Sequence, residues 1–421
     1  MLRRPSGEIE RLLQSQLDEL PQLLLTNLVE KKLTDLKVPD PKGNAERLAK
    51  HILAEGGANF RIENADDAGP DQELAIEFTE EDGEGLTAAA DRFMASLPEL
   101  IEKVSATTSA SIFRRLKKDW PEQWAWQQSV EGPFRENLEA RWGEPFTLLR
   151  MLLTVSREIG AEQHAKHNRS RARRPRHRRD VLFRLHVRAC QITAEIMALM
   201  EAGFADGAMA RWRTLHEIDV VATVIADQDD DLAKRYLDHE VIEARRAALM
   251  YDECHEELGY RPLSARQRAK IERDFDAMKK RYGAAFAEGY GWAAHHLKVD
   301  GKRFSDLEKA AGQSSMRSYY KFASYNVHAG IKGITYRLGL LDRRVMLAGA
   351  SNAGFEEPLQ NTAVTLTRIT SLLLDDLTSI DDQVVMRVLL KLQDEIPPAA
   401  MRAARKLKRD DLAVRRSAST G

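Results

Sequence analysis

Apolar residues recur three or four positions apart along most of this chain, and that period is typical of α-helices. A first stripe runs from Ile9 to Leu36 and stops before Pro39, and from about Leu86 onward the period rarely stops. We therefore expect an all-α protein, a multi-helix bundle. The predicted helices span residues 9–36, 86–104, 109–118, 133–160, 180–203, 206–226, 229–257, 264–282, 315–340, 357–378 and 381–412.

A strand-like pattern occurs near residues 60–80. There Leu74, Ile76 and Phe78 alternate with polar residues, and glycines on both sides indicate turns. The surrounding stretch 62–91 contains no Lys or Arg, whereas acidic residues recur in it. We expect a small two-strand element inside an acidic linker.

The length of 421 residues allows one large or two ordinary domains. We expect an N-terminal helical region with the acidic linker at 1–130, and a helical core domain at 131–421 that contains a basic loop at 164–179. Tryptophans gather near this boundary, which predicts a packed junction, with an aromatic ligand site as the alternative. They are Trp120, Trp124, Trp126 and Trp142.

Charge and motifs exclude several classes of protein. Lys plus Arg total 64 and Asp plus Glu total 65, so a net charge of -1 does not indicate a nucleic-acid or membrane partner. The chain lacks a signal-peptide core and an apolar run of about 18 residues, so we expect a cytoplasmic protein without membrane contact.

Cys190 and Cys254 fit neither a disulfide framework nor a zinc site and are expected to be buried. No phosphate loop, HExxH or paired Glu-x-x-His motif occurs, so no metal and no cofactor is expected.

The most unusual composition lies at Lys166–Arg179, which reads KHNRSRARRPRHRR and contains no acid. Guanidinium groups bind phosphate oxygens at two points, so this segment is a candidate nucleic-acid contact. The alternative is a solvated loop that pairs with the acidic stretch 62–91. The candidate nucleic-acid-binding residues are Arg171, Arg173, Arg174, Arg176, Arg178 and Arg179.

A charged pair interrupts the largely apolar helix predicted at 206–226. Arg213 and Glu217 lie four positions apart, so both side chains project from one side of the helix and can pair. Burying such a pair costs free energy unless its neighbours complete the hydrogen bonding. The pair is therefore either a structural ion pair within the bundle or part of a preorganised charged site.

A polar stripe follows on the helix predicted at 315–340, where Arg317, Tyr320, Ser324 and His328 step by three, four and four positions. A serine-hydrolase site is disfavoured because no third residue that orients the histidine is visible. A histidine with Arg and Tyr can cleave RNA through the substrate's own 2′-hydroxyl, without a metal. The alternative is a buried hydrogen-bond network with the Arg213 helix. The candidate catalytic residues are His328, Ser324, Tyr320, Arg213 and Glu217.

Several of these segments together resemble an uncharacterised bacterial helical family, domain of unknown function 5677. The resemblance rests on the run Ala208–Glu217, on Gly291-Trp292, on Tyr320–Ser324 and on His328-Ala329-Gly330. It covers roughly Leu182 to Leu341 and implies an intracellular helical bundle with no established activity.

A more distant comparison is with the HEPN superfamily of helical ribonucleases, toxins and phage-defence proteins. Its signature is an Arg, four to six residues and a His, whereas Arg317 stands eleven positions before His328. The function expected is metal-independent cleavage of RNA or a nucleotide in a bacterial defence or stress system. The alternative is a non-enzymatic helical module that binds nucleic acid or an acidic protein partner through the Arg-rich loop. A homodimer is compatible with both.

Overall fold

The computed structural model describes residues 8–56, 60, 74–169, 177–342, 344–374 and 379–419. Throughout these residues the regular elements are helices and no strand occurs, which confirms the all-α class. The predicted two-strand element is not found: residues 74–79 have no regular structure, and 61–73 lie outside the described residues.

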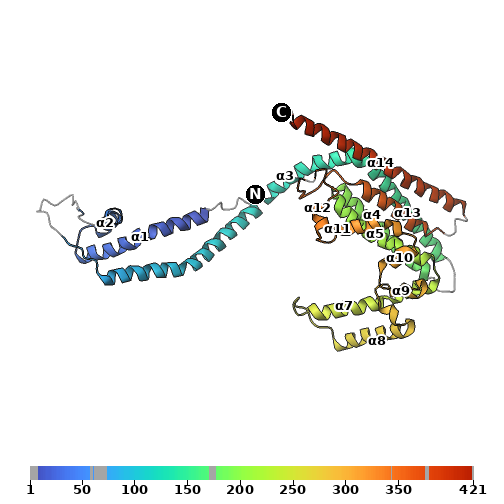
Figure 1. Ribbon diagram of the computed structural model, residues 1–421, viewed down its shortest axis with the longest axis horizontal. Coiled ribbons are helices and arrows are strands. Elements are labelled where there is room, and N and C mark those ends of the chain that lie inside the picture. Colours follow the sequence, from blue (N-terminus) through green and yellow to red (C-terminus); the bar gives the residue numbers. More distant parts are fainter. Residues whose placement is uncertain are drawn as a thin grey trace. The chain divides into compact units, whose positions relative to one another are not determined.

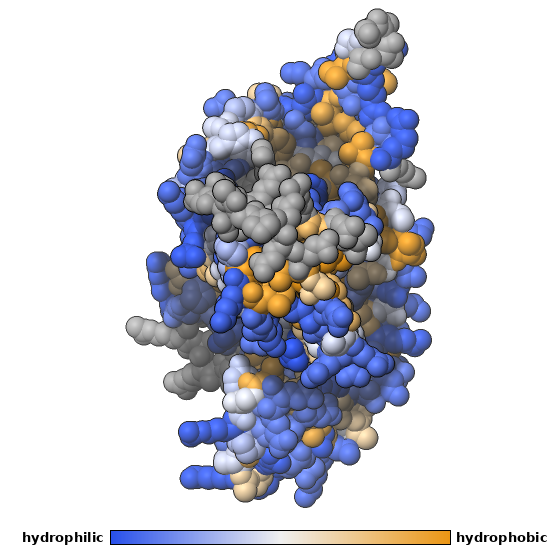
Figure 2. Space-filling view, turned by 90° about the vertical axis from the view of Figure 1, so that its left-hand side faces the viewer, coloured by the Kyte–Doolittle hydropathy of each residue, from blue (hydrophilic) through white to orange (hydrophobic). Residues whose placement is uncertain are grey.

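The chain divides into two compact units, Met1–Gln128 and Ser129–Gly421. A single long helix, α3 (Glu80–Arg169), contributes residues to both units (Figure 1). Hydrophilic residues make up most of the surface that Figure 2 displays, with hydrophobic residues gathered in smaller patches. In the part of the chain that the structure describes, no helix is both long and apolar enough to cross a bilayer.

The first unit pairs α1 (Glu8–Asp35) with α2 (Pro41–Glu55) around a small core. The sequence pattern did not predict α2, because the prolines after α1 indicated a break. Pro41 instead occupies the first turn of α2, where its missing N–H costs no hydrogen bond, and Asp40 caps that turn by accepting from the N–H of Gly43. The buried apolar residues between the two helices are Val29, Leu33, Val38 and Ala45.

Three predicted helices, 86–104, 109–118 and 133–160, are one continuous helix, α3. Their separation was inferred from prolines, yet α3 runs through Pro98, Pro121, Pro133 and Pro145. A proline removes one backbone hydrogen bond and clashes with the preceding turn, but hydrogen bonds on both sides can hold the helix together. The prediction of three separate helices was therefore wrong.

The second unit packs the C-terminal part of α3 with four other long helices around its main core. Their bounds are α4 (His177–Glu201), α5 (Ala205–Ala226), α13 (Glu356–Ser371) and α14 (Ile380–Ser419). The indole ring of Trp142 meets Phe355 edge to face, with ring centroids 5.1 Å apart. Trp212 of α5 donates from its indole nitrogen to Thr365 Oγ1 at 3.0 Å, which ties α5 to α13.

Shorter helices complete the second unit. The predicted helix 229–257 is interrupted at His239, the segments that form α9 and α10 were not predicted, and the predicted helix 315–340 breaks after Tyr325. These seven helices are α6 (Asp230–Asp238), α7 (Glu240–Cys254), α8 (Ala265–Tyr282), α9 (Gly291–Leu297), α10 (Phe304–Ala310), α11 (Arg317–Tyr325) and α12 (Ile331–Thr335).

The turn between α11 and α12 is tight, which explains the break in the predicted 315–340 helix. A Cβ atom on Gly333 would lie 2.2 Å from the carbonyl oxygen of Tyr325, so only glycine allows this approach. The N–H of Gly333 donates to the carbonyl of Gly330, and α12 begins at the next residue, Ile331. His328 therefore leaves the helical stripe on which its spacing had placed it.

Candidate functional site

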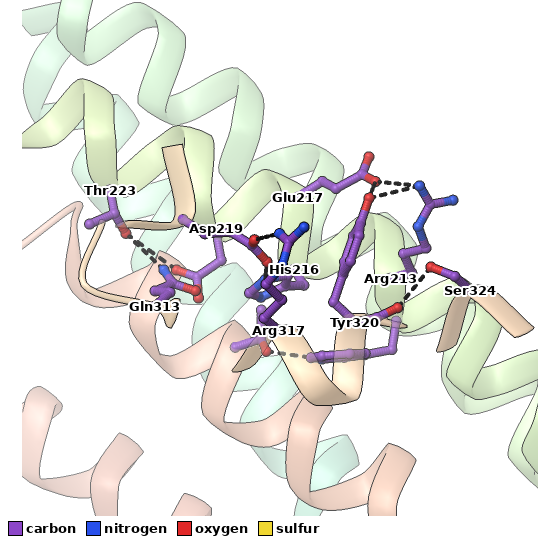
Figure 3. Close-up of polar contacts among 12 residues, drawn as sticks. Arg213, His216, Glu217, Asp219, Thr223, Gln313, Arg317, Tyr320 and Ser324 are labelled. Atoms are coloured by element: carbon purple, nitrogen blue, oxygen red, sulfur yellow. Dashed lines mark hydrogen bonds and ion pairs between the residues drawn. The ribbon is translucent and has the colours of Figure 1, made fainter. Parts of the chain in front are cut away.

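Helix α5 presents charged side chains toward α11 and the short helix α10, and both helices pack against it. Figure 3 shows the close contacts among these side chains. Arg213 and Glu217 are partly exposed, whereas His216 and Asp219 are buried. The charged pair predicted on α5 therefore belongs to a larger polar network.

Tyr320 of α11 joins the two members of the predicted pair. Arg213 donates from Nη2 to the phenolic oxygen at 2.7 Å, and the phenol donates to Glu217 Oε1 at 2.7 Å (Figure 3). Arg213 also pairs directly with Glu217 at 3.2 Å and lies over the tyrosine ring, 4.8 Å from its centroid. Burial, followed by the hydrogen bond to Glu217, raises the pKa of Tyr320 to about 12. The charges of Arg213 and Glu217 balance each other, and the phenol of Tyr320 links both residues of α5 to α11.

A second group of polar contacts lies deeper and contains a carboxylate that the sequence pattern did not single out. Glu308 of α10 lies 3.3 Å from His216 Nε2, and it also pairs with Arg317 at the start of α11. Glu308 and His216 are almost fully buried. Burial lowers the pKa of His216, and the glutamate acts in the opposite direction. Because Glu308 stands in a seven-residue helix without a clear period, its burial was not visible in the sequence.

Asp219 is the other buried carboxylate of α5. Burial raises its pKa to about 7, and Arg368 of α13, 3.4 Å away, opposes that shift. Gln313 and Thr223 face the same carboxylate, and Gln313 donates to Thr223 Oγ1 at 3.5 Å (Figure 3). An acidic residue on a largely apolar helix could have indicated a buried carboxylate in the sequence. Its partners could not be predicted, because they come from distant segments.

Ser324 and His328 do not join the predicted catalytic group. The Ser324 hydroxyl donates to the carbonyl of Tyr320 on its own helix at 2.8 Å, so its proton points to the backbone and not to a general base. His328 is exposed beyond the end of α11, where its backbone N–H donates to the Ser324 carbonyl at 3.2 Å. The structure thus brings Arg213, Glu217 and Tyr320 together and places His328 elsewhere.

His328 lines a separate cavity of about 500 Å³ at the start of α5. Tyr325 and Asn326 from the end of α11 line it too, together with Phe204 and Arg337. Asp206 in the first turn of α5 pairs with Arg337 at 3.1 Å and accepts from the N–H of Leu338 at 2.8 Å. The cavity therefore combines a histidine, an amide and aromatic rings beside a helix N-terminus.

The two described arginines at the end of the basic segment contact backbone carbonyls. Arg178 donates to the carbonyls of Ala226 and Gln228 at 3.5 and 3.1 Å, near the end of α5. Arg179 donates to the carbonyl of Leu373 at 3.1 Å. Both side chains thus help to hold helix ends. The other candidate nucleic-acid contacts, Arg171, Arg173, Arg174 and Arg176, lie outside the described residues.

The four tryptophans are divided between the two units, and the cysteine expectation was right for one residue only. Trp142 is buried in the core of the second unit, and about half of the surface of Trp120, Trp124 and Trp126 in the first unit is exposed. Cys190 is buried as expected, whereas Cys254 is exposed, which corrects the expectation for that residue.

Comparison with known proteins bears on the family of one segment of the chain. Within the described residues no group of three or more His, Cys, Asp or Glu side chains could hold a metal ion. No curated protein and no solved structure matches the chain. Residues 179–344 match the model of the family of unknown function DUF5677, which confirms the resemblance over this segment of the chain.

Proposed function

We propose that the protein is a cytoplasmic, metal-independent enzyme that cleaves RNA or a nucleotide in the cavity lined by His328. The observation that carries this proposal is the place of His328, an exposed imidazole at a cavity of about 500 Å³ beside the N-terminus of α5. A histidine is the side chain best suited to proton transfer near neutral pH.

The start of α5 supports the binding of a phosphate group. The first N–H groups of a helix have no acceptor within the helix and carry the positive end of its dipole. The N-cap residue, Phe204, provides no side-chain cap for them. The carboxylate of Asp206 opposes an anion here, but Arg337 and the N–H of Leu338 offset its charge. Arg337 also lines the cavity, where a guanidinium can bind phosphate oxygens.

Two exposed aromatic rings support the binding of a base. Phe204 and Tyr325 both line the cavity and keep more than a third of their surface exposed. Unstacked bases in single-stranded RNA bind by stacking on such rings. Asn326, which also lines the cavity, can donate to or accept from a base edge.

In the proposed reaction His328 acts as the general base. It accepts the proton of the substrate's 2′-hydroxyl, and the 2′ oxygen then forms a bond to phosphorus. The bond from phosphorus to the 5′ oxygen breaks, that oxygen takes a proton from water, and a 2′,3′-cyclic phosphate remains. Arg213, Glu217 and Tyr320 are positioning residues in this scheme, because they hold α11, and with it the following His328 turn, against α5.

The test is incubation of the purified full chain with mixed cellular RNA, with and without a chelator, followed by gel analysis. The matched variants are His328→Ala and His295→Ala, since His295 is also exposed but lies on α9 and does not line this cavity. Chelator-resistant cleavage by the wild type and by His295→Ala, lost in His328→Ala, is the expected result. Equal cleavage by all three proteins, or none by the wild type, would overturn the proposal.

A second candidate is a binding module without catalysis, and one observation favours it. Arg213, Glu217 and Tyr320 bond to one another, as residues of a structural network do, although the buried Nε of Arg213 has no hydrogen-bond partner among the described residues. The contact with nucleic acid or an acidic protein would then come from the Arg-rich segment. The test replaces Arg171, Arg173, Arg174 and Arg176 by Ser and keeps Arg178 and Arg179, which hold helix ends. RNA binding that persists unchanged in this variant would exclude the module.

A further inference from the structure

We propose that a second cavity, between α3 and α4, binds a single-chain amphiphile with an anionic head group. This cavity has a volume of about 770 Å³, within the range of roughly 300 to 1,000 Å³ that is typical of small-molecule sites. It shares no lining residue with the His328 cavity, and the inference is independent of the proposed cleavage.

The walls of this cavity are mainly apolar. Phe183, Val187 and Cys190 contribute from α4, and Ala161 lies opposite them on α3. About two thirds of the Val187 surface is exposed, although it lies in the middle of a helix in the second unit. Apolar surface of this kind gains free energy when a hydrocarbon chain covers it.

Positive charge at the cavity comes from both helices. Arg157 of α3 and Arg184 of α4 line it, and both side chains are exposed. In the described part of the chain neither guanidinium has an ion pair. The carboxylate of Asp180, which also lines the cavity, instead lies 3.0 Å from His167. Two guanidinium groups without a carboxylate partner favour an anionic head group.

Two polar side chains of the cavity wall are buried, and neither is charged. His186, which is buried, lies 3.2 Å from Thr370 Oγ1, and burial lowers its pKa to about 4, so it is neutral at pH 7. Burial also raises the pKa of the neighbouring Cys190 thiol to about 11, so that group stays protonated. An uncharged, mainly apolar interior with cations at exposed positions matches a molecule that has one apolar and one anionic end.

The first test measures binding of dodecanoate to the full chain by calorimetry, below the micelle concentration, with dodecanol as the uncharged comparison. The double variant Arg157→Gln/Arg184→Gln should weaken dodecanoate binding by about tenfold or more, because it removes both charged donors to the carboxylate of the ligand. The control variant Arg114→Gln/Arg115→Gln removes the same charge from exposed positions of α3 in the first unit and should bind normally.

A second readout uses the two cysteines of the chain. Dodecanoate should slow alkylation of Cys190, which lines the cavity, and leave Cys254, which is exposed elsewhere, unaffected. Ala161→Trp, at an exposed position of the wall, should fill the cavity, abolish binding and keep the helical circular dichroism. Equal affinity for dodecanol and dodecanoate, unchanged binding in the Arg157/Arg184 variant, or equal protection of both cysteines would overturn the proposal.

Discussion

Glu308 of α10 lies 3.3 Å from the imidazole of His216 on α5 and also pairs with Arg317, so one buried carboxylate links three segments. Replacing Glu308 by Ala leaves the imidazole and the guanidinium without that partner. We expect the free energy of unfolding to fall by roughly 3 to 5 kcal/mol, measured by urea denaturation. The exposed neighbour Lys309→Ala is the control, and a similar loss in both variants would contradict a structural role for the carboxylate.

The phenolic oxygen of Tyr320 bridges Arg213 and Glu217, so Tyr320→Phe removes two hydrogen bonds and keeps the ring. Because the direct pair at 3.2 Å remains and both charged groups are partly exposed, we expect a loss of only about 1 to 2 kcal/mol in unfolding free energy. Tyr319→Phe, on the same helix and exposed, should change nothing. A double-mutant cycle with Glu217→Gln should show coupling, and strict additivity would argue against the bridge.

Two glycines of α3 should respond oppositely to alanine. A Cβ on Gly160 would lie 2.6 Å from Cε1 of the His186 ring, whereas a Cβ on Gly85 would meet no atom within 4 Å. We expect Gly85→Ala to raise the melting temperature, since alanine favours a helix by about 1 kcal/mol over glycine. Gly160→Ala should lower it, because overpacking costs roughly 1 to 3 kcal/mol. Stabilisation by both substitutions would show that the histidine ring moves freely.

Asp219 should make stability depend on pH in a defined direction. Its folded pKa of about 7 exceeds the ordinary value of 3.8, so the native state binds the proton more tightly. The contribution of this group is therefore complete below about pH 4 and is lost as pH rises through 7.

Asp219→Asn keeps the side chain neutral and should remove that loss. Relative to the variant, the wild type should lose stability between pH 4 and 7 with a slope of up to about 1.4 kcal/mol per pH unit. Arg368, which lies 3.4 Å from the carboxylate, is retained in both proteins. Urea denaturation across this pH range provides the measurement, and parallel stability curves would show that Asp219 is already ionised.

Local patterns were sufficient for the helical class and for several helices of the second unit. The predicted helices 206–226 and 264–282 differ from α5 and α8 by only one residue at one end, because the apolar period of α5 and the Ser264 capping box of α8 are local features. The prediction of helix ends at the prolines of α3 was wrong. A proline weakens a helix locally, but the hydrogen bonds of the surrounding turns can continue it.

Part of the candidate site could also be predicted from the spacing of residues along the sequence. Arg213 and Glu217 pair as their four-residue separation predicts, and the stripe of α11 places Tyr320 against them. The same periodicity placed His328 on that stripe, but the chain turns after Tyr325 because the following segment packs Gly333 against its carbonyl.

The sequence alone determined that this chain is helical, which residues on each helix share a face, and which family its segment 179–344 resembles. Tertiary structure alone decided that Glu308 meets His216, that His328 lines its own cavity, and that α3 and α4 leave a second cavity between them. The reason is physical: periodicity is set by hydrogen bonds over four residues, whereas burial and pairing depend on which distant segments pack together.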